Sequence, residues 1–228
     1  LTEYFIRYVQ HKNRYLAYLH ISFEREAYRN ETNLSYLGKY QQALEILKRL
    51  QKKYPADYNI AANLGTTYEL TGNNELALQF IKKGMQLNPD SHEGSEWVHV
   101  KILEAKLQLA KNPDWLLQNR VLNTGVTFNS KQADNLSAKA WNIEYQLQER
   151  VPFTPFPDKI LGNVFDELGD LYATQQSIEL AYIAYDFSLQ YNPADNYGTA
   201  KKMEELKPLL KKIKFRYLTG NSIIITGN

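Results

Sequence analysis

The sequence predicts an all-α protein, an α-α superhelix built from stacked pairs of antiparallel helices. Three observations lead to this prediction. Landmark residues recur at a spacing of 34 residues, apolar residues between them recur every three or four positions, and glycine, asparagine or proline stands where helices should end. A two-helix unit of this length cannot bury its own apolar face, so each unit needs neighbours stacked on it.

The most regular stretch is Tyr58–Ser91, which contains two predicted helices. The apolar stripe of the first helix consists of Ile60, Leu64 and Tyr68, and that of the second consists of Ala77, Ile81 and Gly84. Asp57 stands where an N-cap belongs, and Gly72 can adopt the left-handed conformation that ends a helix. Pro89 follows the second helix and stops it.

Landmarks of the same kind occur on both sides of this stretch. Three pairs of identical residues are separated by 34 positions, namely Gly38 and Gly72, Ala43 and Ala77, and Pro55 and Pro89. Two more pairs are separated by 104 positions, namely Ala77 and Ala181, and Pro89 and Pro193. A shared register at several landmarks predicts three repeats, at about residues 24–57, 58–91 and 162–195.

Two of these stretches resemble a known family. Leu64-Gly65, Tyr68, Ala77, Gly84 and Pro89 resemble one tetratricopeptide repeat, and Leu168-Gly169, Tyr172, Ala181 and Pro193 resemble another. The first repeat departs from the pattern, with Asn30-Glu31 in place of the leucine-glycine pair. The resemblance implies a right-handed solenoid. The phrase GSEWVHVKILEAK also resembles segments of uncharacterised bacterial proteins of this family, which implies a lineage but no activity.

The remaining stretches are less regular. Residues 92–161 hold degenerate central repeats, with a long helix after His92, a short second helix over 115–122 closed by Gly125, and a third helix over 136–147. We expect a C-terminal capping helix at about 196–216, which covers the last repeat, and a tail at 217–228. Residues 1–23 have helical tendency and can cover the first repeat or contact another protein. We therefore expect a single domain over 1–228.

Composition narrows the possible functions. The chain has 228 residues, a formal net charge of +2 and no cysteine. The absence of cysteine excludes disulfides, thiolate zinc sites and cysteine nucleophiles. The mild net charge predicts neither a nucleic-acid partner nor binding to a membrane surface. The sequence contains no run of 18 apolar residues, so it predicts no membrane span within the chain. Because residue 1 is Leu1, a targeting segment could have preceded it, and envelope, periplasm and cytoplasm all stay open.

The resemblance implies a scaffold that holds a peptide or a partner segment on its concave face, which is lined by the first helices of the repeats. By register, the groove candidates are Arg25, Tyr28, Arg29, Asn59, Thr66, Glu69, Asn163, Asp166 and Asp170. These residues make one end of the groove basic and aromatic and the other end acidic, which predicts a ligand of complementary polarity. Family members that clamp a C-terminal carboxylate use lysine and asparagine, whereas the matching pairs here are Ala62 and Thr66, or Asp166 and Asp170. Such a clamp is therefore disfavoured.

Two alternatives stay open beside the scaffold. The first is a metal-dependent or hydrolytic enzyme in the central region, where His92, Glu96 and His99 are spaced to share one helix face. A solvated face explains that spacing more simply. Since no phosphate loop and no Gly-x-Ser-x-Gly or His-Glu-x-x-His motif occurs, we expect neither an enzyme nor a cofactor. The second is a self-associating module, a homo-oligomer that pairs through the N-terminal aromatic residues or the tail Ile223–Ile225.

Overall fold

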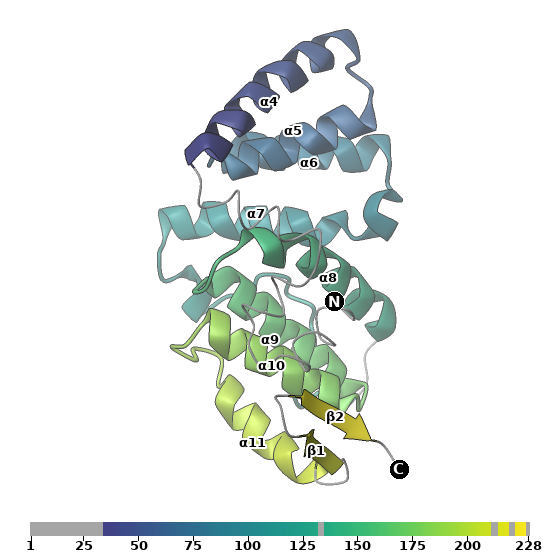
Figure 1. Cartoon of the computed structure of the whole chain (residues 1–228), viewed down its shortest axis with the longest axis vertical. Coiled ribbons are helices and arrows are strands. Elements are labelled where there is room, and N and C mark those ends of the chain that lie inside the picture. The colour runs from purple at the N-terminus through teal and green to yellow at the C-terminus, as the bar shows by residue number, and fades with distance from the viewer. Residues whose placement is uncertain (1–33, 132–134, 211–213, 219–221, 227–228) are drawn as a thin grey trace.

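The helices stack in chain order along one long axis (Figure 1). The computed structural model describes residues 34–131, 135–210, 214–218 and 222–226. The helices are α4 (Leu34–Lys53), α5 (Tyr58–Leu70), α6 (Asn74–Leu87), α7 (Glu96–Lys111), α8 (Leu136–Arg150), α9 (Lys159–Thr174), α10 (Ile178–Tyr191) and α11 (Thr199–Leu210). The predicted α-α superhelix is confirmed for these helices.

Shorter elements join the helices and end the chain. The 3-10 turns are η1 (Ser91–Gly94), η2 (Trp115–Leu117) and η3 (Val151–Phe153), and the strands are β1 (Lys214–Leu218) and β2 (Ser222–Thr226). The strands pair antiparallel, with Lys214 opposite Thr226. Two strands therefore stand where the end of the capping helix and the tail at 217–228 were predicted.

The capping helix itself is shorter than the predicted 196–216. It begins at Thr199 because the Asp195 carboxylate accepts the free N–H groups of Thr199, at 2.6 Å, and of Ala200, at 3.2 Å. Gly198, with φ +66°, turns the chain into the helix. Pro208 lies within its last turn, and the helix ends at Leu210.

Side-chain caps set the starts of the repeat helices. Asp57, Asn73 and Asp158 each accept the N–H of the residue three positions later, which satisfies one of the free donors of α5, α6 and α9. Gly72, with φ +82°, ends α5, as the sequence predicted. The local sequence therefore sets where these helices begin, while packing against neighbouring helices stabilises them.

Each of the two regular helix pairs has a close contact at a glycine. A Cβ on Gly65 of α5 would lie 2.5 Å from Ile81 Cδ1 of α6, and a Cβ on Gly169 of α9 would overlap the ring of Tyr185 in α10. Gly65 and Gly169 are 104 positions apart, and so are Ile81 and Tyr185. The two pairs thus use the same contact, with a side chain of the second helix filling the space over the glycine of the first.

Two apolar cores meet at α7. The first core lies among α4, α5, α6 and α7 and includes Val100 and Leu103 of α7. The second extends from α7 to α11 and includes Val98, Ile102 and Ala105 of α7. Helix α7 is therefore buried on two sides and belongs to both halves of the stack.

The central region differs from its prediction in one helix. Trp115–Leu117 form only the 3-10 turn η2, and the chain is irregular over residues 118–131, so the predicted short second helix over 115–122 is wrong. The backbone N–H groups of Val121 and Leu122 donate to side chains of α9 instead of to carbonyl groups one helical turn earlier. The helices predicted on either side of this segment are present as α7 and α8.

Some predictions lie outside the described residues, namely the N-terminal helix over 1–23 and the groove candidates Arg25, Tyr28 and Arg29. Of the helices that the structure describes, none combines the length and the apolar character needed to cross a membrane.

Candidate peptide-binding surface

The same four positions of the repeat stand out on α5 and on α9. On α5 they are Asn59, Ala62, Asn63 and Thr66, which we call the open face. On α9 they are Asn163, Asp166, Glu167 and Asp170, which we call the closed face. Each residue of the open face is 104 positions before its counterpart on the closed face. The two sets differ in what covers them.

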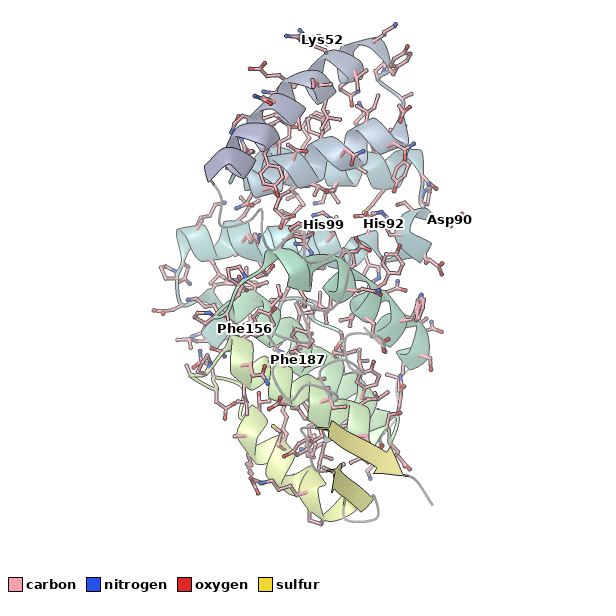
Figure 2. All side chains as sticks on the ribbon, in the orientation of Figure 1. Lys52, Asp90, His92, His99, Phe156 and Phe187 are labelled. Carbon is pink, nitrogen blue, oxygen red and sulfur yellow. The ribbon has the colours of Figure 1, made fainter. Side chains whose placement is uncertain are left out.

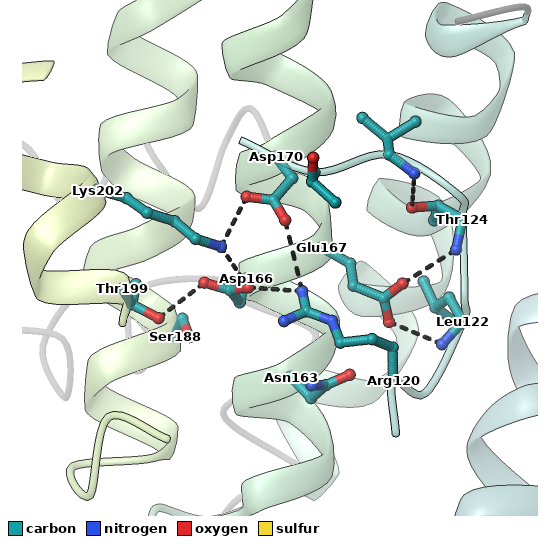
Figure 3. Close-up of polar contacts among 12 residues, drawn as sticks. Arg120, Leu122, Thr124, Asn163, Asp166, Glu167, Asp170, Ser188, Thr199 and Lys202 are labelled. Carbon is teal, nitrogen blue, oxygen red and sulfur yellow. Dashed lines mark hydrogen bonds and ion pairs between the residues drawn. The ribbon is translucent and has the colours of Figure 1, made fainter. Parts of the chain in front are cut away.

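The closed face binds the backbone of the irregular segment that follows η2 (Figure 3). The Asn163 Oδ1 atom accepts the N–H of Val121 at 2.7 Å. The Glu167 carboxylate accepts two N–H groups, from Leu122 at 2.7 Å and from Thr124 at 3.1 Å. Three backbone donors of a non-helical segment are thus satisfied by two side chains of one helix.

Ion pairs complete this contact. Arg120 donates to Asp166 Oδ2 at 2.5 Å, and its Nη2 atom lies 3.6 Å from Asp170 Oδ2. From the other side, Lys202 of α11 donates to Asp166 at 2.8 Å and to Asp170 at 2.7 Å. Because Lys202 comes from the capping helix and Arg120 from the central segment, the closed face joins three distant parts of the chain.

Neutral hydroxyl donors also serve these carboxylates. The Thr199 hydroxyl donates to Asp166 Oδ1 at 2.7 Å, and the Tyr185 hydroxyl donates to Asp170 Oδ1 at 2.8 Å. Burial raises the pKa of Asp170, and the charge of Asp166 raises it further. Burial also raises the pKa of Glu167, although Arg120 and two backbone N–H groups oppose the shift. The closed face is therefore a dense, mostly neutralised polar cluster.

The prediction that Asn163, Asp166 and Asp170 line an open groove is wrong. Their exposed fractions are 0%, 0% and 3%. The predicted acidic end of the groove is occupied by Arg120 and Lys202, so a basic ligand could reach these carboxylates only by replacing one of those side chains. Sequence reasoning could not show this, because the segment that covers the face is irregular and lies more than 40 residues before it.

The Glu69 side chain is also largely covered, with 8% of it exposed, and does not line an open groove. Its carboxylate accepts hydrogen bonds from Lys106 at 2.7 Å and from Arg150 at 2.8 and 3.2 Å, and it lies 2.8 Å from His99 Nε2. Burial alone would raise the pKa of Glu69, but Arg150, His99 and Lys106 outweigh it and hold the pKa well below its usual value. Glu69 thus ties α5 to α7 and α8.

His92, Glu96 and His99 come together, but not on one helix face. His92 lies in η1 with φ 47°, before α7 begins, and Figure 2 shows it beside that helix with His99. His92 Nδ1 pairs with Glu96 Oε1, and His99 Nδ1 lies 3.3 Å from Glu96 Oε2. Glu96 contacts both imidazoles, and His99 directs its other ring nitrogen to Glu69. These side chains therefore satisfy one another's hydrogen-bonding groups.

This arrangement shifts two pKa values. Burial would raise the pKa of Glu96, but the hydrogen bonds from His92 and His99 outweigh it and bring the pKa to about 2. The hydrogen bond to Glu96 raises the pKa of His92. The pair therefore favours an ionised Glu96 beside a charged His92, which stabilises the contact between η1 and α7.

The open face differs from the closed face by being accessible. Asn59, Asn63 and Thr66 are exposed, and Ala62 is half-buried. The repeat register predicted Asn59 and Thr66 as groove residues, but it did not predict Asn63 or, on α9, the equivalent Glu167. Both missed residues follow a predicted candidate, Asn59 or Asn163, by four positions, so the helical period could have revealed them.

The comparisons with known proteins agree with the repeat assignment. A family model described as tetratricopeptide repeat matches residues 36–96, which include nearly all of α4, all of α5 and α6, and the first residue of α7. No curated protein matches the chain.

Proposed function

Because the chain contains tetratricopeptide repeats, we propose that it is a non-enzymatic scaffold that binds a non-helical segment of a partner protein on the open face of α5. Tetratricopeptide repeats generally mediate contacts between proteins. The proposal goes further by naming the surface and the way it recognises the partner.

One observation carries the proposal. The four positions that on α9 contact the irregular segment, two through its backbone and two through Arg120, are present on α5 without a covering segment of described residues. Asn59 has the same side chain as its counterpart Asn163, whose amide oxygen accepts a backbone N–H. A partner segment lying on α5 would meet the same kind of acceptor at the same point of the repeat.

The open face also indicates the chemistry of the partner. Asn59 and Asn63 carry amides, and Thr66 carries a hydroxyl, so each can both donate and accept hydrogen bonds. None of the four residues is charged, unlike the three carboxylates of the closed face. We infer that the open face forms hydrogen bonds with the partner's backbone, and that the partner segment does not need a cluster of basic residues.

The experiment selects ligands and then maps them. A library of random nonapeptides is selected on the wild-type chain, and the affinities of the recovered peptides are measured by fluorescence anisotropy. The variant Asn59→Ala/Asn63→Ala/Thr66→Ala should weaken binding about 5- to 30-fold, because losing one or two hydrogen bonds at about 1 kcal/mol each has that effect. Exposed surface substitutions rarely unfold a protein.

A control variant tests whether the loss is specific. Gln79→Ala and Gln86→Ala remove exposed amides from α6, the second helix of the same repeat, and should leave the affinity unchanged. Peptides that bind the open-face variant and the wild type equally well would refute the proposal.

A further inference from the structure

The segment on the closed face has three properties of a bound peptide. Its backbone N–H groups at Val121, Leu122 and Thr124 are satisfied by side chains of α9. The guanidinium of Arg120 is paired with Asp166 on that helix. Two adjacent apolar side chains, those of Val121 and Leu122, are 3% and 4% exposed and belong to the second core.

The contact with Arg120 is built around its guanidinium. Asp166 and Asp170 face the guanidinium from α9, and the ring of Tyr197 lies 5.1 Å from Arg120 Cζ. Carboxylate on one side and an aromatic face on the other is a favourable setting for arginine in particular, since lysine lacks the planar group. The side chain of Arg120 is still 30% exposed, so this contact can be reached from solvent.

Space remains on both sides of the segment. A surface pocket of about 660 Å³ lies between it and α7 and includes Lys111 and Trp115 in its lining. A second pocket, of about 410 Å³, is lined by residues of the irregular segment together with Glu167 and Lys202. Arg120 and Asn123 line both pockets. The segment therefore borders two surface pockets, while its Val121 and Leu122 side chains are buried in the second core.

We propose that Arg120–Thr124 is an internal ligand of the closed face, and that this face accepts in its place a partner segment with the same chemistry: an arginine followed by two apolar residues in a non-helical backbone. The proposal extends the binding mode of the proposed function from α5 to a second surface. A tethered segment acts at an effective concentration on the order of millimolar, so a partner must bind more tightly than that or meet a chain whose own segment is detached.

The experiment supplies the segment in trans. The probe is a synthetic peptide with the sequence of residues 118–127, QNRVLNTGVT. In the full chain, Arg120→Ala/Leu122→Ala weakens the internal ligand without altering α9. The peptide should bind this variant at least tenfold more tightly than it binds the wild type, and it should raise the Tm of the variant.

Two control peptides test the chemistry. A peptide in which the arginine is replaced by alanine, and one with scrambled sequence, should each bind the weakened chain at least tenfold more weakly than QNRVLNTGVT. Equal binding of the scrambled peptide, or no binding of QNRVLNTGVT to a folded variant, would overturn the proposal.

A measurement on the wild type covers the case in which the variant does not fold. Amide hydrogen exchange of Val121, Leu122 and Thr124 should be at least a hundredfold faster than that of Leu168 and Leu171 in the buried part of α9, because an internal ligand detaches locally. Exchange of both sets at one common rate would mean that the segment leaves only when the protein unfolds, and the proposal would fail.

The two proposals can fail separately. The open-face variant Asn59→Ala/Asn63→Ala/Thr66→Ala, combined with Arg120→Ala/Leu122→Ala, should still bind QNRVLNTGVT. If the added α5 substitutions abolish that binding, the peptide occupies the open face, which would refute the internal ligand and leave the proposed function standing.

Discussion

At the scale of single residues, position in the repeat matters more than residue type. Gly65 and Gly169 each lie under a side chain of the following helix, whereas Gly84, in the second helix of its pair, has the backbone of Ala62 as its nearest neighbour at 3.7 Å. The first two glycines are required because there is no room for a methyl group. Gly84 is not under that constraint, although it is buried.

This difference predicts opposite effects of one substitution. Gly169→Ala should lower the free energy of unfolding by about 1–3 kcal/mol, because the new methyl overlaps the fully buried ring of Tyr185. Gly84→Ala should raise it by about 0.5–1 kcal/mol, because alanine favours helix and the methyl makes ordinary contacts. Urea unfolding of both variants measures the effects. Equal losses in the two would contradict this account of the helix contact.

At the scale of elements, the helices with strong local signals are the ones that could be predicted. Helices α5, α6, α9 and α10 combine apolar stripes with glycine or proline at their ends, and three of the four have side-chain caps. Residues 118–127 have apolar residues but no helix, because their donors are taken by Asn163 and Glu167, more than 40 positions later. No local pattern reports such a partner.

The candidate site was predictable to the same limited degree. Register alone identified the helix faces that matter on α5 and α9. It could not tell which face was covered, since Asn59 and Asn163 are the same residue type, one exposed and one fully buried. Burial of Glu69 likewise depends on Arg150, which is 81 residues away. The prediction of the site was therefore limited by partners that are distant along the chain, and not by uncertainty about the repeat register.

The pKa of Glu96 predicts how the contact between η1 and α7 responds to pH. Its pKa in the folded protein is about 2 against an ordinary value of 4.5, so the folded state holds fewer protons than the unfolded state between these values. The stabilisation from Glu96 is present above pH 4.5 and is lost as the pH falls toward 2. At about 1.4 kcal/mol per pKa unit, the full loss is about 3.5 kcal/mol.

Urea unfolding of the wild type and of Glu96→Gln between pH 7 and pH 2 tests this prediction. The difference in unfolding free energy between the two proteins should shrink as the pH falls below 4.5. Glu75→Gln, at an exposed position in the first turn of α6, is the control. Its unfolding free energy should differ from that of the wild type far less, and with far less dependence on pH. A difference that stays constant with pH would show that His92 and His99 do not lower the pKa of Glu96.

At the scale of the whole molecule, the two apolar cores share α7. Ile102 and Leu103 are adjacent and both fully buried, yet Ile102 belongs to the core that extends to α11 and Leu103 to the core shared with α4, α5 and α6. Repeat proteins are held together by contacts between neighbours, so each half should have its own local stability. Helix α7 is the place where the two stabilities are coupled.

Adjacent substitutions should therefore destabilise different halves. Leu103→Ala should reduce amide protection mainly in α5 and α6, and Ile102→Ala mainly in α9 and α10, each by about 2–5 kcal/mol. Native-state hydrogen exchange resolves the two patterns, and each variant is the matched control for the other. If the two substitutions lower amide protection equally in every helix, the molecule unfolds as one unit. The two cores would then not differ in local stability, and the prediction would be wrong.

The position of Lys202 has a consequence for anyone who wishes to lengthen this array. Helical repeats are usually treated as interchangeable modules, because each contacts only its neighbours. Here α11 sends Lys202 and Thr199 to two carboxylates of α9 that are almost completely removed from water. A new helix pair grafted after α10 would displace Lys202 and Thr199 from these carboxylates. It would therefore have to supply its own cation and hydroxyl at the same positions, so a generic repeat cannot be inserted there without loss of stability.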